Sequence, residues 1–317
     1  MTLSRPAALP SDREDYVERA GGCLRYAVWN TSGKPRGTVV LIQGRAEFIE
    51  KYAMEVAGEL VERGFAVYAV DLRGQGLSSR MLPDHEKGHI DDFTTYVADL
   101  AVFLETVVLP QAPQPRLLLS HSTGGAVALR YLVAEGSRHF AAAAFSSPMT
   151  GLPAGRWIRL AAAALGLIPG GTVRYAPGTG PYDPKKHPFA TNDVTHDERR
   201  YDFTRQWFEA DPRLVLGGPT IGWLQQAFRS FDVLNAPGSL ERIALPTLIV
   251  SGTGDTVVDT ATHLEAVRRI PGAEHAVVEG ARHELLMETD ARRAQFWAAF
   301  DRLAGRVCPP QNGGQER

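Results

Sequence analysis

Hydrophobic runs and amphipathic stretches alternate along the first half of the chain. Residues 37–43 and 65–71 are apolar runs of strand length, and each is followed by a segment whose apolar positions recur at helical spacing. The strongest helical pattern covers residues 93–107, and Pro110 is expected to end that helix. Strands that alternate with crossover helices predict an α/β fold with a mostly parallel central sheet flanked by helices.

The alternation stops after residue 148 and resumes near residue 246. The part between contains apolar, polar and aromatic helical stretches and a Gly/Pro-rich segment, but no good strand pattern. It is therefore predicted to be a helical lid inserted between two strands of the sheet. The expected organisation is a flexible N-terminus at 1–15, a core formed by 16–148 and 236–305, the lid at 149–235, and a flexible tail at 306–317.

The segment Leu-Leu-Leu-Ser-His-Ser-Thr-Gly-Gly at residues 117–125 joins an apolar run to a helical pattern. Ser122 lies at the junction, and the residues two before and two after it, Ser120 and Gly124, are small. This is the pattern of the nucleophile elbow of α/β-hydrolases, in which a sharp strand-to-helix turn exposes a serine hydroxyl above the sheet. The alternative is an ordinary strand–turn–helix whose serine caps the helix. The partners found elsewhere in the chain favour the nucleophile.

A serine hydroxyl is a weak nucleophile near neutral pH, so it needs a base, and the base needs an orienting acid. In this fold the chain order is serine, acid, histidine. Asp255 follows the strand predicted at 246–251 and is the predicted acid, although a local turn would also explain it. Asp259 is the nearest rival, but it lies farther from the strand and is expected to cap a helix.

His283 lies between the last predicted strand and the last predicted helix, where this fold places the base. The other histidines lie in polar loops, in the insertion, or within predicted helices and strands. His121 adjoins Ser122, but its side chain must diverge from the serine at the turn. It is therefore expected to pack or to form a wall of the entrance, and His283 is the predicted base.

The negative oxygen of a tetrahedral intermediate needs backbone N–H donors. One is expected from Thr123, which opens the helix, and the other from Arg45 in the loop after the strand at 37–43. Gly44 in the same loop would also suit a plain turn. The Arg45 side chain has two equal interpretations, solvation at the surface or contact with a polar head group.

Composition limits the partners and the compartment. The chain has 317 residues, 44% hydrophobic and 22% charged, with a net charge of -2, so neither nucleic acid nor a polybasic lipid contact is indicated. The polar N-terminus lacks the apolar core of a signal peptide, so a cytoplasmic protein is expected. The most apolar segment, 157–168, is too short to span a bilayer and suits a transient contact with the inner membrane face and a buried lid equally well. Cys23 and Cys308 form no metal or disulfide pattern, and Cys23 is expected to be buried and Cys308 exposed.

Several motifs together resemble the α/β-hydrolase superfamily and, within it, the bacterial lysophospholipases and monoacylglycerol lipases. The resemblance covers about residues 16–303. It is carried by Gln-Gly-Arg-Ala-Glu-Phe at 43–48 with Lys51-Tyr52, Asp-Leu-Arg-Gly-Gln-Gly-Leu-Ser at 71–78, Lys-Gly-His-Ile-Asp-Asp-Phe at 87–93, the elbow at 120–124, and Gly-Pro-Thr-Ile-Gly-Trp at 218–223. Relatives often carry His-Gly in place of Gln43-Gly44, and glycine in place of Ser120. The resemblance implies a monomeric or dimeric serine hydrolase without metal or cofactor, whose lid shapes an acyl pocket.

These observations predict hydrolysis of a single-chain lipid ester, a lysophospholipid or a monoacylglycerol, through an acyl-enzyme on Ser122. The aromatic insertion can line an acyl pocket, although packing of the lid onto the body explains most such stripes. Substrate contacts are expected from Gln43, Gly44, His121, Trp157, Trp207 and Trp223. Two other functions stay open, a short-chain carboxylesterase or thioesterase with the same triad, and a non-catalytic ligand-binding protein of this fold.

Overall fold

A central sheet of eight strands organises the protein in a computed structural model that describes residues 5–153 and 155–309. The first two strands, β1 (Arg13–Arg19) and β2 (Gly22–Trp29), form an antiparallel hairpin. Gly21 and Gly22 make its turn with φ values of 80° and 136°, which glycine adopts most readily. The other strands are β3 (Gly37–Ile42), β4 (Phe65–Val70), β5 (Arg116–His121), β6 (Ala142–Ser146), β7 (Thr247–Gly252) and β8 (Glu274–Val278).

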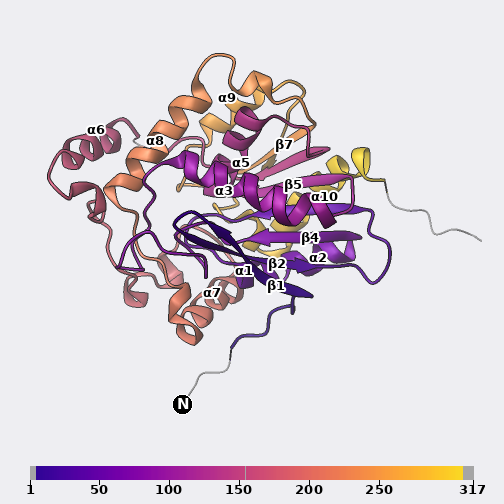
Figure 1. The fold of residues 1–317 in the computed structure, drawn as a ribbon, viewed down its shortest axis with the longest axis horizontal. Coiled ribbons are helices and arrows are strands. Elements are labelled where there is room, and N and C mark those ends of the chain that lie inside the picture. The colour runs from indigo at the N-terminus through magenta and orange to yellow at the C-terminus, as the bar shows by residue number, and fades with distance from the viewer. Residues whose placement is uncertain (1–4, 154, 310–317) are drawn as a thin grey trace, which may run out of the picture.

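The strand order across the sheet is β1-β2-β4-β3-β5-β6-β7-β8, and all pairings from β4 to β8 are parallel. Every residue of β3 to β7 is buried, because helices cover both faces (Figure 1). This burial explains why these strands are continuous apolar runs rather than alternating patterns. The predicted α/β fold with a mostly parallel sheet is confirmed.

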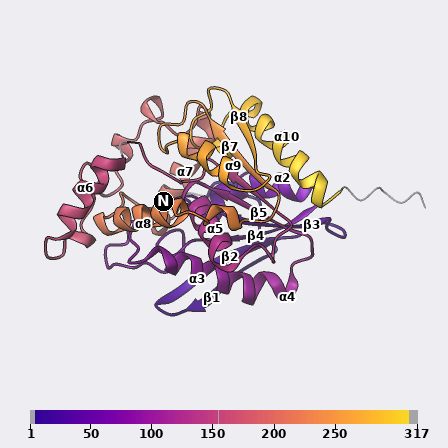
Figure 2. The ribbon, with the colours of Figure 1, turned by 90° about the horizontal axis from the view of Figure 1, so that it is seen from above.

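The helices of the body form two layers, one on each face of the sheet. One layer contains α3 (Phe93–Phe103), α5 (Ser122–Glu135) and α9 (Ala261–Arg269), and the other contains α1 (Ile49–Ala53), α2 (Val56–Glu62) and α10 (Asp290–Val307). Figure 2 shows α3 and α10 on opposite sides of the sheet. Each layer buries one apolar cluster against the strands, so the carboxyl ends of the parallel strands are held in fixed positions.

The helical segment that begins at Phe93 runs farther than predicted. After α3 it continues as a π-helical turn (Leu104–Val108) and a short α4 (Leu109–Gln111), so Pro110 does not end it. Proline is tolerated there because it occupies the first turn of α4. The continuous segment Phe93–Gln111 has the length and mean hydropathy, 1.4, of a membrane span, but half of it is buried inside the protein, as in core helices.

Between β6 and β7 the chain leaves the sheet and forms three helices, α6 (Gly155–Gly166), α7 (Glu198–Ala210) and α8 (Ile221–Asn235). Short 3₁₀ turns and irregular segments connect them, including Gly171–Val173 and Pro184–Lys186. We call residues 149–235 the cap. α8 packs on the body, whereas α6 lies at the outer end of the molecule (Figures 1 and 2). Whether the cap moves as a lid stays a prediction.

The two cysteines are placed opposite to expectation. Cys23 in β2 is partly exposed, and Cys308 is buried. The reason is that α10 continues to Val307, past the predicted end of the core at residue 305, and Cys308 then lies beside the start of β3, where a Cβ at Gly37 would be 3.3 Å from its Sγ atom. There the Cys308 carbonyl accepts a hydrogen bond from Arg36, and burial raises the pKa of the Cys308 thiol to about 11.

Candidate active site

The turn between β5 and α5 holds Ser122 in an unusual backbone conformation. Ser122 has a φ of 50°, in the left-handed region that non-glycine residues rarely adopt. The helix begins directly against β3, since a Cβ at Gly124 would lie 2.3 Å from the Gln43 carbonyl oxygen. Gly124 is therefore required by the close approach of two backbones.

Ser122 lies within hydrogen-bond distance of the predicted base. The His283 Nε2 atom is 2.8 Å from the Ser122 Oγ atom, and the His283 Nδ1 atom is 2.8 Å from Asp255 Oδ2. The other Asp255 oxygen accepts hydrogen bonds from the N–H groups of Val257, at 2.9 Å, and Val258, at 3.2 Å. Burial raises the pKa of Asp255, but the contact with His283 and the two N–H groups outweigh it, so the net pKa is below its ordinary value.

The topology explains how residues so distant in sequence meet. Ser122, Asp255 and His283 follow β5, β7 and β8, whose carboxyl ends lie at the same edge of the sheet. The loop after β7 passes close to the loop after β8, because a Cβ at Gly252 would lie 2.2 Å from the Ala281 carbonyl oxygen. This approach sets the carboxylate beside the imidazole.

The loop after β3 brings backbone N–H groups to the same place. Neither the Arg45 nor the Thr123 N–H group donates to any of the described residues, and both residues line the cavity at Ser122. The Gly44 N–H group is already used, since it donates to Glu47 Oε2 at 2.5 Å. Ala46 has a φ of 60°, which bends this loop sharply. The two predicted oxyanion donors therefore make no hydrogen bond within the described part of the chain, and their residues line the same cavity as Ser122.

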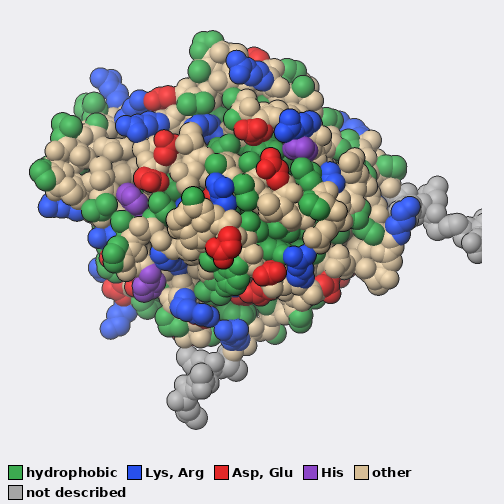
Figure 3. Space-filling view, viewed as in Figure 1, with side chains coloured by type: hydrophobic (Ala, Val, Ile, Leu, Met, Phe, Trp, Pro, Cys, Tyr) green, Lys and Arg blue, Asp and Glu red, His purple; other side chains and the backbone are tan. Residues whose placement is uncertain are grey.

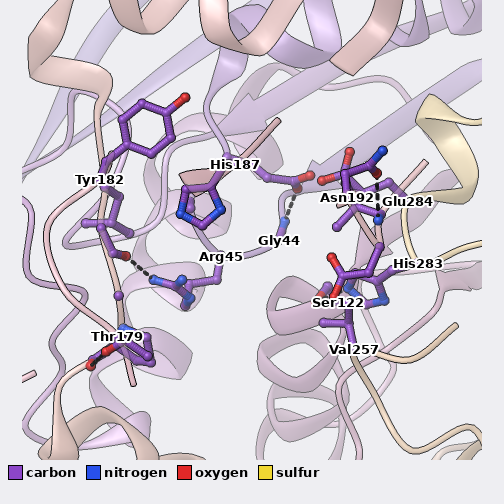
Figure 4. A pocket seen from close by; sticks show the side chains of 18 of the residues that line it. Gly44, Arg45, Ser122, Thr179, Tyr182, His187, Asn192, Val257, His283 and Glu284 are labelled. Carbon is purple, nitrogen blue, oxygen red and sulfur yellow. Dashed lines mark hydrogen bonds between the residues drawn. The ribbon is translucent and has the colours of Figure 1, made fainter. Parts of the chain in front are cut away.

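A cavity of about 910 Å³ lies between the body and the cap and opens onto Ser122 (Figure 4). Of the six residues predicted to contact substrate, Gly44, His121 and Trp223 line it. Gln43, Trp157 and Trp207 do not, contrary to expectation. Trp157 is exposed on α6, and Trp207 is buried in a separate apolar cluster under α7. The spacing of aromatic residues on a helix does not show which face of that helix will line the cavity.

Comparison with known proteins identifies the family of this chain. The sequence model of the family Hydrolase_4, described as "Serine aminopeptidase, S33", matches residues 33–290. The chain belongs to this family. It is 35% identical to lysophospholipase L2 of Escherichia coli (strain K12) over 81% of this chain and 76% of that protein. It is 26% identical to human monoglyceride lipase, over 89% and 87% of the two chains.

A solved structure shares the fold of this chain. A soluble variant of monoglyceride lipase from Saccharomyces cerevisiae, in complex with a substrate analog, superposes with a TM-score of 0.72. The match covers 96% of this chain and 98% of that one at 20% sequence identity. The α/β-hydrolase fold is thus established by the sheet topology, the family match and this likeness.

A buried group of charged side chains borders the cavity at Ser122. The Lys51 ammonium contacts Glu47 Oε1 and Glu284 Oε1, each at 2.7 Å, and the Tyr52 hydroxyl donates to Glu47 Oε2 at 2.7 Å. We call Glu47, Lys51, Tyr52 and Glu284 the buried charge network. It anchors the loop after β3 through Glu47 and the base through Glu284, which follows His283.

Burial and ion pairing shift the pKa values of the network in opposite directions. Desolvation raises the pKa of Glu47, but the Lys51 ammonium and the hydrogen bonds from Lys51 and Tyr52 bring it down to about 2. Burial lowers the pKa of Lys51, yet the two carboxylates outweigh it and the net pKa is raised. Burial raises the pKa of Glu284 above its ordinary value. The sequence analysis used Lys51-Tyr52 only as part of a resemblance and assigned no role to Glu47 or Glu284.

His121 is a neutral wall of the site. Its ring centroid lies 4.8 Å from that of His283, and its Nδ1 atom is 3.0 Å from the Ser146 carbonyl oxygen. Burial lowers the pKa of His121 to about 4. It makes no hydrogen bond to Ser122, so the expectation that it is not the base agrees with the geometry.

Gln43 belongs to a second buried network, which explains its absence from the cavity. Its Nε2 atom donates to Asp71 at 3.2 Å, and Asp71 also accepts from Arg25 at 2.8 Å and from the N–H groups of Ile49 and Leu77. Asp71, the first residue of the motif at 71–78, therefore helps to hold the loop after β3, which contains the predicted oxyanion donor Arg45.

Proposed function

We propose that this carboxylic ester hydrolase cleaves esters of single-chain lipids, lysophospholipids or monoacylglycerols, through an acyl-enzyme on Ser122. The observation that carries the proposal is a cavity of about 910 Å³ that begins at a serine hydrogen-bonded to His283. The relatives named lysophospholipase L2 and monoglyceride lipase support the same substrate class.

The reaction follows from the positions of the side chains. His283 Nε2 accepts the Ser122 proton while Oγ attacks the acyl carbonyl carbon, and the carbonyl oxygen becomes an oxyanion held by the Arg45 and Thr123 N–H groups. The imidazolium then gives its proton to the leaving alcohol as the ester C–O bond breaks. Water repeats the sequence on the acyl-enzyme and releases the fatty acid. Asp255 holds the Nδ1–H group and stabilises the imidazolium in both halves.

The cavity suits a long acyl chain. Its walls near the serine include the apolar side chains Met149, Leu152, Leu216, Trp223, Leu224 and Val257. An acyl chain gains roughly 0.8 kcal/mol for each CH₂ group it buries. A short-chain esterase would have no use for so much apolar wall, which disfavours that alternative.

A panel of substrates tests the proposal. Lysophospholipids, monoacylglycerols and p-nitrophenyl esters of two to sixteen carbons are offered to the wild type and to Ser122→Ala, together with a fluorophosphonate probe. Ser122-dependent hydrolysis that increases with chain length is expected. Rates that peak at acetyl or butyryl esters would assign the enzyme to the short-chain esterases, and absence of labelling at Ser122 would favour a binding protein.

We also propose that α6 contacts a membrane surface transiently, with the protein cytoplasmic and peripheral to the inner face. Trp157 is 69% exposed, Leu160 53% and Leu167 87%, beside Arg156 and Arg159. Figure 3 shows hydrophobic and basic side chains on the lobe that α6 forms. Apolar side chains next to basic ones suit the interface of an anionic bilayer, where a water-insoluble ester would be found.

A further inference from the structure

Arg45 contributes two different groups to the cavity. Its N–H group is the predicted oxyanion donor, whereas its guanidinium crosses to the cap, where Nη1 donates to the Gly217 carbonyl oxygen at 2.8 Å. Figure 4 shows this side chain reaching away from Ser122 toward the segment that carries Thr179 and Tyr182. Gly88 makes room for it, since a Cβ there would lie 2.9 Å from Nη1. The guanidinium is thus held at a fixed place beyond the reacting centre.

The charge of Arg45 is not neutralised by the protein. Among residues 5–153 and 155–309, no carboxylate lies within ion-pair distance of it, and its neighbours include the phenol of Tyr96 and, 6.0 Å away, the ring of Trp223. Burial lowers its pKa to about 10, so it remains a cation at neutral pH. Lys51, in contrast, is bound by two carboxylates at 2.7 Å. A half-buried cation without a counter-ion, on a ligand cavity, is a site for an anion that comes with the ligand.

Two other cations on the cap side of the cavity have carboxylate partners. Arg205 lies 3.5 Å from Asp202, and Lys186 lies 4.0 Å from Asp183. Asp193 is the acidic side chain of the described lining that lies outside the buried charge network. Among the described cations of the lining, Arg45 is therefore the one without a carboxylate within ion-pair distance.

We propose that the Arg45 guanidinium binds the phosphodiester anion of a lysophospholipid whose ester carbonyl lies at Ser122. The inference rests on the proposed function and selects between its two substrates. Guanidinium groups bind phosphate oxygens in pairs, with charge-assisted hydrogen bonds. An arginine side chain is comparable in length to the glycerol unit that separates ester from phosphate, so one residue serves both ends of the substrate. A monoacylglycerol offers only neutral hydroxyls to the same cation.

The test compares two substrates with the same acyl chain, 1-palmitoyl-lysophosphatidylcholine and 1-palmitoylglycerol. Arg45→Gln should lower kcat/KM on the lysophospholipid by about 10- to 100-fold more than on the monoacylglycerol, mainly through KM. Arg45→Lys, which keeps the charge but not the paired donors, should recover part of the loss. Arg268→Gln, on the exposed face of α9, is the matched control and should change neither substrate.

Equal losses on both substrates would overturn the inference, because Arg45 would then act through the loop or the cap contact at Gly217. Absence of loss on either would overturn it as well. A second assay distinguishes failure of the Arg45 inference from failure of the proposed function. Glycerophosphocholine should inhibit hydrolysis of a short p-nitrophenyl ester competitively, and Arg45→Gln should abolish this even if no lipid is cleaved. Equal inhibition by inorganic phosphate would assign the site to free phosphate instead.

Discussion

The body and the cap differ in how their side chains are partnered. In the body, Asp255 pairs with His283 at 2.8 Å, and Lys51 contacts Glu47 and Glu284, each at 2.7 Å. In the cap, α6 buries only Ala162 among its described residues, and the Arg45 guanidinium that reaches the cap from the body meets a backbone carbonyl rather than a carboxylate. The groups that would carry out the chemistry are partnered within the protein, whereas α6 leaves apolar side chains exposed and Arg45 has no carboxylate partner among the described residues.

The difference indicates where the protein is preorganised. Catalysis by positioned dipoles requires groups that do not rearrange during the reaction, and the buried charge network holds them. The inner part of the cap is joined to the body by backbone hydrogen bonds, from Gly88 to Gly218 at 3.1 Å and from Thr220 to Gly88 at 2.8 Å. We therefore expect substitutions on the body wall to change rate and stability, and substitutions on the outer cap to change where the enzyme binds.

The largest effect is expected at the acid. Asp255→Asn keeps the shape of the side chain but can orient His283 in the wrong tautomer, so kcat should fall by about 10⁴-fold. The measurement is kcat on a p-nitrophenyl ester, with the melting temperature as a check on folding. Asp259→Asn, four residues on, is the control and should retain most activity; a loss at Asp259 and none at Asp255 would reverse the assignment.

Lys51→Met should damage both stability and rate. It leaves the carboxylates of Glu47 and Glu284 buried without their cation, which costs about 3–5 kcal/mol of unfolding free energy in comparable buried pairs. Denaturant unfolding measures the loss. Adding Glu284→Gln should restore part of it, because one unpaired charge is removed. Lys87→Met at the partly exposed Asp84 pair is the control, and an equal loss there would argue against the network.

The pH dependence should show one ascending limb. Only neutral His283 can accept the Ser122 proton, so activity should increase from acid to neutral pH. Asp255, with its lowered pKa, and His121, with a pKa of about 4, have lost their protons before this range and should add no second step above about pH 5. The profile of kcat/KM on a neutral ester measures this; a flat profile from acid to neutral pH would contradict it.

The outer cap should affect binding but not folding. Replacing Trp157 and Leu167 together by serine should lower partition onto anionic vesicles about tenfold, because two exposed apolar side chains no longer enter the interface. The unfolding free energy should stay within about 0.5 kcal/mol of wild type, since both residues are exposed. Leu264→Ser on α9 is the control; unchanged partition of the cap variant would remove α6 from the contact.

The smallest change in stability is expected at Ser120, two residues before Ser122. The Ser120 hydroxyl is buried without a hydrogen-bond partner, so Ser120→Ala should change the unfolding free energy by less than about 1 kcal/mol, with stabilisation as the favoured sign. Gly124→Ala, four residues away, should be far worse because its Cβ would meet the β3 backbone. Thermal unfolding of the two variants tests this; similar losses would show that the elbow is not set by close packing.

The sequence predicted the sheet and the triad for one physical reason. Parallel strands end at a common edge, so residues that follow apolar runs, such as Asp255 and His283, can be placed near each other without knowledge of their contacts. The buried charge network could not be found this way, because Lys51 and Glu284 belong to segments with no pattern that links them. Aromatic spacing on α6 and α7 likewise cannot say which face meets the cavity, and Trp157 and Trp207 were placed wrongly for that reason.

The position of β8 at the end of the sheet has a consequence for biosynthesis. Ser122 leaves the ribosome well before His283, which follows the last strand. A nascent chain that ends before His283 would carry the serine without its predicted base, so ester hydrolysis is expected only once that segment has been made.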